Sequence, residues 1–172
     1  MTVLSIFAFS GLANAQPGTV GTGTMGITAT VVGTLNLTFV TAGAGMAVGG
    51  TGTAAGTLAF GNVSMFGGSV PAGATQTVNG VLGFTISTPV IIRGDISNST
   101  SGAFTLTAAL ATADAVNAWT VGAIDISTGA VTTINGAALY ATNTPYVFAI
   151  TIPAAAPAGL ITNTINFVAT SN

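Results

Sequence analysis

The longest regular pattern in the sequence is an alternation of apolar and polar residues over positions 27–39. Thr or Asn fills all but one of the even positions. The odd positions hold Ile27, Ala29, Val31, Gly33, Leu35, Leu37 and Phe39. Because side chains alternate between the two faces of a strand, this pattern predicts one long amphipathic strand, roughly 43 Å in length at about 3.3 Å per residue.

The rest of the chain consists of short β-rich runs separated by Gly, Pro, Asn and Ser, and none of it has helical periodicity. Further strands are expected at 57–66, 77–88, 90–96, 103–110, 119–126, 130–134, 146–152 and 161–169. Alternation predicts core side chains at Leu82, Phe84, Ile86, Phe104, Leu106, Leu110, Tyr146, Phe148, Ile150, Ile152, Ile165 and Phe167. The fold class is therefore all-β: an antiparallel β-sandwich, Greek-key or Ig-like, with about 8–9 strands.

The N-terminal region reads as an export signal followed by a leader. Residues 3–12 form a short apolar run, and Ala13-Asn14-Ala15 fits a small-x-small cleavage site. We therefore expect residues 1–15 to be a signal peptide and the protein to be secreted or at the cell surface. Residues 16–26 are rich in Gly and Thr, so we expect them to be a flexible leader, and we expect residues 27–172 to form a single sandwich domain.

Charge is almost absent from the chain and excludes several classes of function. The four charged side chains are Arg93, Asp95, Asp114 and Asp125, and the chain has no His and no Cys. Nucleophilic triads and zinc sites of the common kinds have no residues to use, and one cation cannot neutralise several phosphates. We expect no catalytic residue, no metal or cofactor and no nucleic-acid partner. No apolar run approaches the roughly 20 residues of a spanning helix, so no membrane span is expected in the mature chain.

Two short motifs have both a chemical and a structural interpretation. Arg93-Gly94-Asp95 is the tripeptide that adhesion receptors read, but residues i and i+2 share a strand face, so a local ion pair is the simpler interpretation. Asp114 and Asp125 could act together as general acid and base in an uncommon hydrolase, yet Asp114 lies in a turn-like stretch suited to backbone capping.

Three sequons permit N-glycosylation, at Asn36, Asn62 and Asn98. A chain this rich in Thr and Ser contains nearly as many by chance. The sequons therefore mark possible modification sites without evidence of enrichment.

The C-terminal third resembles the closing strands of small secreted microbial β-sandwich proteins of the fimbrial and spore-coat-U-like kind. The resemblance rests on PYVFAITIP at 145–153, PAGL at 157–160 and TINFVAT at 164–170, with a fainter similarity in GTLAFG at 56–61. It implies a Greek-key sandwich with a role in a surface structure or filament.

Two function classes follow from these observations. The first is a structural subunit of a filament, pilus, coat or extracellular matrix that binds copies of itself, since low charge leaves little repulsion between subunits. The second is a secreted binding module for carbohydrate, a surface or ice, using a Thr/Asn-rich sheet face, although the Thr-x-Thr triplets have no constant spacing. In the first class, strand 27–39 either completes its own sandwich or is donated to a neighbouring subunit by donor-strand exchange.

Overall fold

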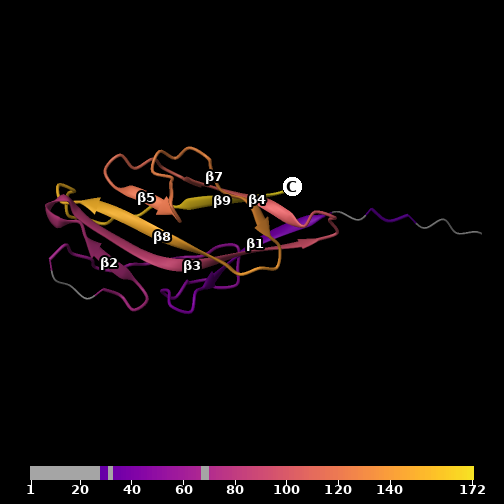
Figure 1. Ribbon diagram of the computed structural model, residues 1–172, viewed down its shortest axis with the longest axis horizontal. Helices are drawn as coiled ribbons and strands as arrows, with labels where there is room; N and C mark the ends of the chain where they lie inside the picture. The colour runs from indigo at the N-terminus through magenta and orange to yellow at the C-terminus, as the bar shows by residue number, and fades with distance from the viewer. Residues whose placement is uncertain (1–27, 31–32, 67–69) are drawn as a thin grey trace, which may run out of the picture. The chain divides into compact units, whose positions relative to one another are not determined.

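The computed structural model describes residues 28–30, 33–66 and 70–172. The chain divides into two compact units, Met1–Val31 and Val32–Asn172. In the first unit, residues 28–30 are exposed and outside regular secondary structure. In the described part of the second unit, nine strands form two antiparallel sheets, which confirms the predicted all-β sandwich (Figure 1).

The larger sheet has the strand order β1-β3-β8-β5-β6, with β2 also paired to β3, and the smaller sheet has the order β7-β4-β9. The strands are β1 (Thr34–Thr41), β2 (Thr75–Val78), β3 (Gly83–Ser97), β4 (Ala103–Leu110), β5 (Ala118–Val121), β6 (Ile124–Asp125), β7 (Thr132–Leu139), β8 (Thr144–Pro153) and β9 (Ile165–Ser171). One short 3-10 turn, η1 (Gly80–Leu82), separates β2 from β3.

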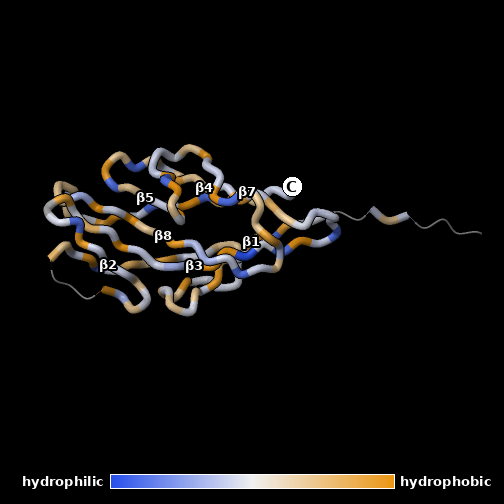
Figure 2. Tube along the Cα trace, in the orientation of Figure 1, coloured by the Kyte–Doolittle hydropathy of each residue, from blue (hydrophilic) through white to orange (hydrophobic). Residues whose placement is uncertain are grey.

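The core lies between the two sheets in two clusters. One is centred on Ile86, Leu110 and Val121, and the other on Ile92 and Leu106. Along β3 apolar residues alternate with more polar ones (Figure 2). Its buried apolar side chains pack against the smaller sheet: Ile86 shares one cluster with Ala108 and Leu110, and Ile92 shares the other with Phe104 and Leu106. Burial of these apolar side chains is the main force that holds the sheets together.

β1 and β2 occupy the same edge of β3, one after the other. β1 pairs along it as far as Thr41 opposite Val90, and β2 resumes with Thr75 opposite Ser87. Pro89 lies in the gap between them, and the alternation of the ladder points its nitrogen toward that gap. The missing N–H therefore costs no ladder bond, which is why β3 runs through Pro89 instead of breaking into the two predicted strands at 77–88 and 90–96.

Two sequence predictions need correction here. The predicted strand 27–39 is observed only as β1 (Thr34–Thr41), since residues 28–30 and Gly33 are outside any strand. Residues 57–66 form no strand: β1 and β2 already occupy the edge of β3, and the bridge that this segment makes is the isolated one between Thr57 and Gly49, in the connection after β1. Phe60 and Val63 of this segment still pack against the first core cluster.

Candidate functional site

Asp114 is the most heavily hydrogen-bonded side chain in the described residues. Its carboxylate accepts bonds from the backbone N–H of Val116 and Asn117, both at 2.9 Å, from Asn117 Nδ2 at 3.0 Å and from Trp119 Nε1 at 2.8 Å. Desolvation opposes ionisation, but these donors outweigh it and hold the pKa of Asp114 well below its usual range. The carboxylate is therefore committed to holding the turn before β5.

The other charged groups are also used locally. Asp125 accepts a bond from the backbone N–H of Ser127 at 2.8 Å, and the Ser127 side chain and backbone lower the pKa of this carboxyl. Arg93 Nη2 lies 2.8 Å from Asp95 Oδ1, and Arg93 Nε donates to the same carboxylate. The ion pair lies within β3, so the tripeptide is not at a projecting loop tip.

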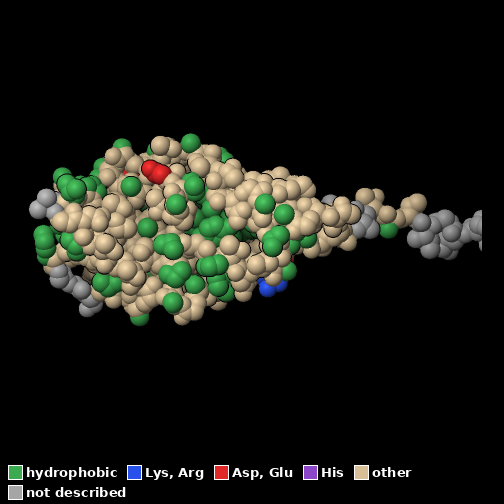
Figure 3. Space-filling model, in the orientation of Figure 1, with side chains coloured by type: hydrophobic (Ala, Val, Ile, Leu, Met, Phe, Trp, Pro, Cys, Tyr) green, Lys and Arg blue, Asp and Glu red, His purple; other side chains and the backbone are tan. Residues whose placement is uncertain are grey.

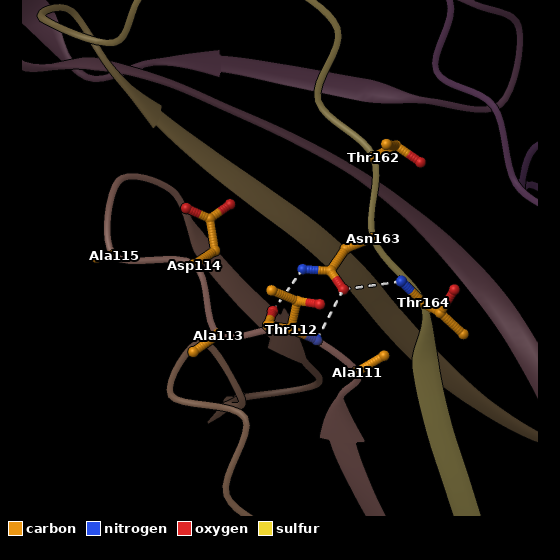
Figure 4. A pocket seen from close by; sticks show the side chains of 8 residues that line it. All are labelled: Ala111, Thr112, Ala113, Asp114, Ala115, Thr162, Asn163 and Thr164. Carbon is orange, nitrogen blue, oxygen red and sulfur yellow. Dashed lines mark hydrogen bonds between the residues drawn. The ribbon is translucent and has the colours of Figure 1, made fainter.

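One open hollow of about 470 Å³ lies beside Asp114 (Figure 4). It is lined by residues 111–115 and 162–164. Asn163 joins the two segments, donating from Nδ2 to the Thr112 carbonyl at 2.7 Å and accepting from the N–H of Thr112 and Thr164. Asp114 is the one carboxylate in the lining, so the hollow holds no acid and base pair.

A second hollow of about 540 Å³ is apolar and lies where β8 ends and β3 begins. It is lined by residues 63–66, Phe84 and most of 152–161. Three large apolar side chains around this hollow are unusually exposed for their type: Phe66 (80%), Leu82 (77%) and Leu160 (91%). Figure 3 shows hydrophobic side chains gathered at this end of the domain. We call Phe66, Leu82 and Leu160, together with this hollow, the apolar end.

The candidate donor-strand residues are only partly brought together. Leu35, Leu37 and Phe39 lie on β1, half-buried against the second core cluster, and β1 pairs with β3 of the same chain. Ala29 and Gly33 are exposed and outside any strand, whereas Ile27 and Val31 lie outside the described residues.

The three sequon asparagines occupy different settings. Asn36 is exposed in the middle of β1, Asn62 is exposed in the segment before β2, and Asn98 is exposed after β3 with φ of 56°. Glycosylation of each remains a prediction.

A set of hydroxyl side chains that the sequence analysis missed is aligned on the outer face of the larger sheet. Thr77, Thr85 and Thr151 are opposite one another across β2, β3 and β8, and the Oγ1 atoms of Thr85 and Thr151 are 2.8 Å apart. The next row comprises Thr75, Ser87, Ala149 and Thr120 across β2, β3, β8 and β5. We call these seven residues, six of which carry a hydroxyl, the hydroxyl face.

No sequence signal could reveal this face, because its threonines come from strands that are far apart in the chain. Thr75 and Thr77 form one of the Thr-x-Thr triplets, but their neighbours are set by the register of β2 and β8 on β3. Constant spacing along the sequence is required only in a repeat protein, not in a sandwich.

Comparison with protein-family models, with curated proteins and with solved structures found no match for this chain. Within residues 28–30, 33–66 and 70–172, no three His, Cys, Asp or Glu side chains lie close enough to hold a metal ion. The same described residues contain no helix of the length and apolarity that crossing a membrane requires.

Proposed function

We propose that this protein is an exported structural subunit that binds copies of itself in a surface filament, pilus, coat or extracellular matrix. The apolar end carries the proposal: Phe66, Leu82 and Leu160 each expose more than three quarters of their surface beside an apolar hollow. Large exposed apolar patches on a folded domain mark sites of association. With four charged side chains in the chain, little electrostatic repulsion opposes that association.

Negative-stain electron microscopy of the purified mature protein tests the proposal. A self-assembling subunit gives filaments or sheets whose amount rises with protein concentration. Particles that stay dispersed and monomeric at all concentrations would contradict it.

Donor-strand exchange through residues 27–39 is the route of assembly that we propose. β1 is a suitable strand to exchange because it lies at an edge and its apolar side chains, Leu35, Leu37 and Phe39, are half-buried. In a neighbour, the same strand would make the same contacts with β3. Each such side chain contributes about 1.5–3 kcal/mol when fully buried, and a head-to-tail contact propagates into a fibre.

The strand-exchange route is tested by deleting residues 16–40 and adding the same segment back as a peptide. The truncated protein should fold only with the peptide, and it should no longer assemble. Assembly of the truncated protein in the absence of peptide would rule this route out. The structural role itself would still be tested by the electron microscopy.

The hydroxyl face supports a second candidate, a secreted module that binds carbohydrate, a surface or ice. Neighbouring residues within a row lie on adjacent strands roughly 4.8 Å apart, and the two rows lie roughly 6.7 Å apart along the strands. The face carries no charge. A regular array of hydroxyl and methyl groups suits a regular, uncharged surface. Sedimentation with insoluble polysaccharide and an ice-recrystallisation assay test this candidate. Loss of binding in Thr85→Tyr, with binding kept in Thr105→Tyr on the other sheet, is the expected result.

A further inference from the structure

β9 is the open edge of the smaller sheet. It pairs with β4 from Ile165 opposite Leu110 to Ser171 opposite Phe104, without any register shift. The N–H of Ala111 donates to the Thr164 carbonyl, and the N–H of Asn172 donates to the Ala103 carbonyl. Backbone groups alternate between the two edges of a strand in an antiparallel ladder. The N–H and C=O groups of the even-numbered residues of β9 therefore bond to β4, and those of Ile165, Phe167 and Ala169 point toward the open edge.

The other strand edges in the described residues are each shortened, irregular or covered. β2 and β6 have four and two residues. β7 shifts register against β4, and irregularities of this kind discourage edge-to-edge pairing. The outer edge of β1 is bridged at Phe39, whose N–H donates to the Thr53 carbonyl at 3.0 Å and whose carbonyl accepts from Gly52.

β9 is neither short nor irregular, and β1, which contacts it through the Phe39–Phe167 ring pair, forms no ladder with it. Its sequence, INFVATS, has no charged residue, no Pro and no Gly. On the solvent-facing side of the smaller sheet, β9 exposes the side chains of Asn166, Val168 and Thr170, and Val168 is 56% exposed. Natural edge strands usually carry a charge, a Pro or a bulge that blocks pairing with another chain.

We infer that β9 pairs with β9 of a second copy of this chain, antiparallel and about a two-fold axis at Val168. Among the described residues, no other strand pairs with this edge. The register places Val168 opposite itself and Asn166 opposite Thr170, so an apolar pair is flanked by two polar pairs. The outward N–H and C=O groups of Phe167 then face those of Ala169, and the two smaller sheets become one. This contact closes on itself, so it is distinct from strand exchange and does not depend on it.

A single introduced cysteine tests the register, because the chain contains none of its own. Val168 would be a non-hydrogen-bonded pair, with Cα atoms about 4.5 Å apart, within the range of roughly 4.4–6.8 Å that a disulfide spans. Val147→Cys is the matched control, since Val147 is 47% exposed on β8, which is flanked by β3 and β5.

Under mild oxidation at micromolar concentration, the full-length Val168→Cys protein should form a disulfide-linked dimer. Paired thiols reach an effective concentration in about the millimolar range, so the rate should exceed that of Val147→Cys at least about a hundredfold. Equal rates in the two variants would overturn the inference. Filaments seen by microscopy alongside equal rates would leave the proposed function intact.

Charge variants give a second and independent measurement by sedimentation velocity. Val168→Lys and Val168→Glu should each lower the dimer fraction, because like charges would be opposed across the axis. An equimolar mixture should restore it, and Val147→Lys should leave it unchanged. A mixture no more dimeric than either variant alone would contradict the two-fold register.

Discussion

Gly94 lies directly against the ring of Phe104: a Cβ at residue 94 would be 2.5 Å from Cε1 and 2.6 Å from Cζ of that ring. Phe104 is 2% exposed, and its ring also packs against that of Tyr140, with ring centroids 5.1 Å apart. The glycine between Arg93 and Asp95 is therefore explained by core packing, without any adhesion receptor.

Gly94→Ala should destabilise the fold by about 1–3 kcal/mol, the usual cost of overpacking a core. The midpoint of urea unfolding should fall while the slope of the transition stays the same. Gly136→Ala is the control, because its added Cβ would meet nothing within 4 Å. Equal midpoints for Gly94→Ala and the wild type would show that the ring moves aside freely.

Thr88 lies on β3 between the residues that pair with β1 and those that pair with β2, and it is only 1% exposed although it is polar. Its hydroxyl accepts from the backbone N–H of Met46 at 2.8 Å and donates to the Gly73 carbonyl at 2.8 Å. One side chain on β3 thus holds both ends of the long connection from β1 to β2.

Thr88→Val keeps the shape but leaves a buried N–H and a part-buried carbonyl without this partner, which should cost about 1–3 kcal/mol. Hydrogen exchange at the Met46 amide should become much faster. Thr85→Val should change stability less, since the Thr85 hydroxyl is only part-buried. Unchanged protection of the Met46 amide would mean that the hydroxyl does not hold the connection.

Much of the fold could be predicted from alternation alone. Phe84, Phe104, Leu106 and Ile150 face the core as expected, because one face of each strand is buried. The prediction was wrong for Leu82, which is 77% exposed. It lies in the 3-10 turn η1, so the alternation of β3 does not extend back to it.

The long-range pairing could not be predicted, because it depends on which strands meet. The continuity of β3 through Pro89 follows from the gap between two other strands, which no local pattern shows. The turn at Gly122, with φ of 61°, splits the predicted strand 119–126 into β5 and β6. The apolar end and the hydroxyl face likewise combine residues from distant segments, and only the register brings them together.

Asp114→Asn should destabilise the protein by about 1–3 kcal/mol at pH 7, because an amide nitrogen would face the Trp119 indole N–H, itself a donor. The folded state lowers the pKa of Asp114. Its contribution is therefore complete above the unfolded value of about 3.9 and is lost as pH falls below it.

Urea unfolding at pH 7, 4 and 2.5 measures this effect. The wild type should lose stability between the two lower values, and Asp114→Asn should lose less. Some acid sensitivity should persist in the variant, because the pKa of Asp125 is lowered as well. Identical pH profiles for the two proteins would show that Asp114 does not contribute through its charge.

Leu160→Asp should weaken association without weakening the fold. Leu160 is 91% exposed at the apolar end, so the substitution removes almost no burial within the subunit and leaves the melting temperature of the monomer nearly unchanged. In an assembly that covers the apolar end, the same carboxylate must be desolvated beside the hollow, so the concentration needed for assembly should rise at least about tenfold. Light scattering during assembly gives this concentration. Val131→Asp, at a site 74% exposed just before β7, is the control for net charge. An equal rise in both variants would assign the effect to charge alone and remove the apolar end from the interface.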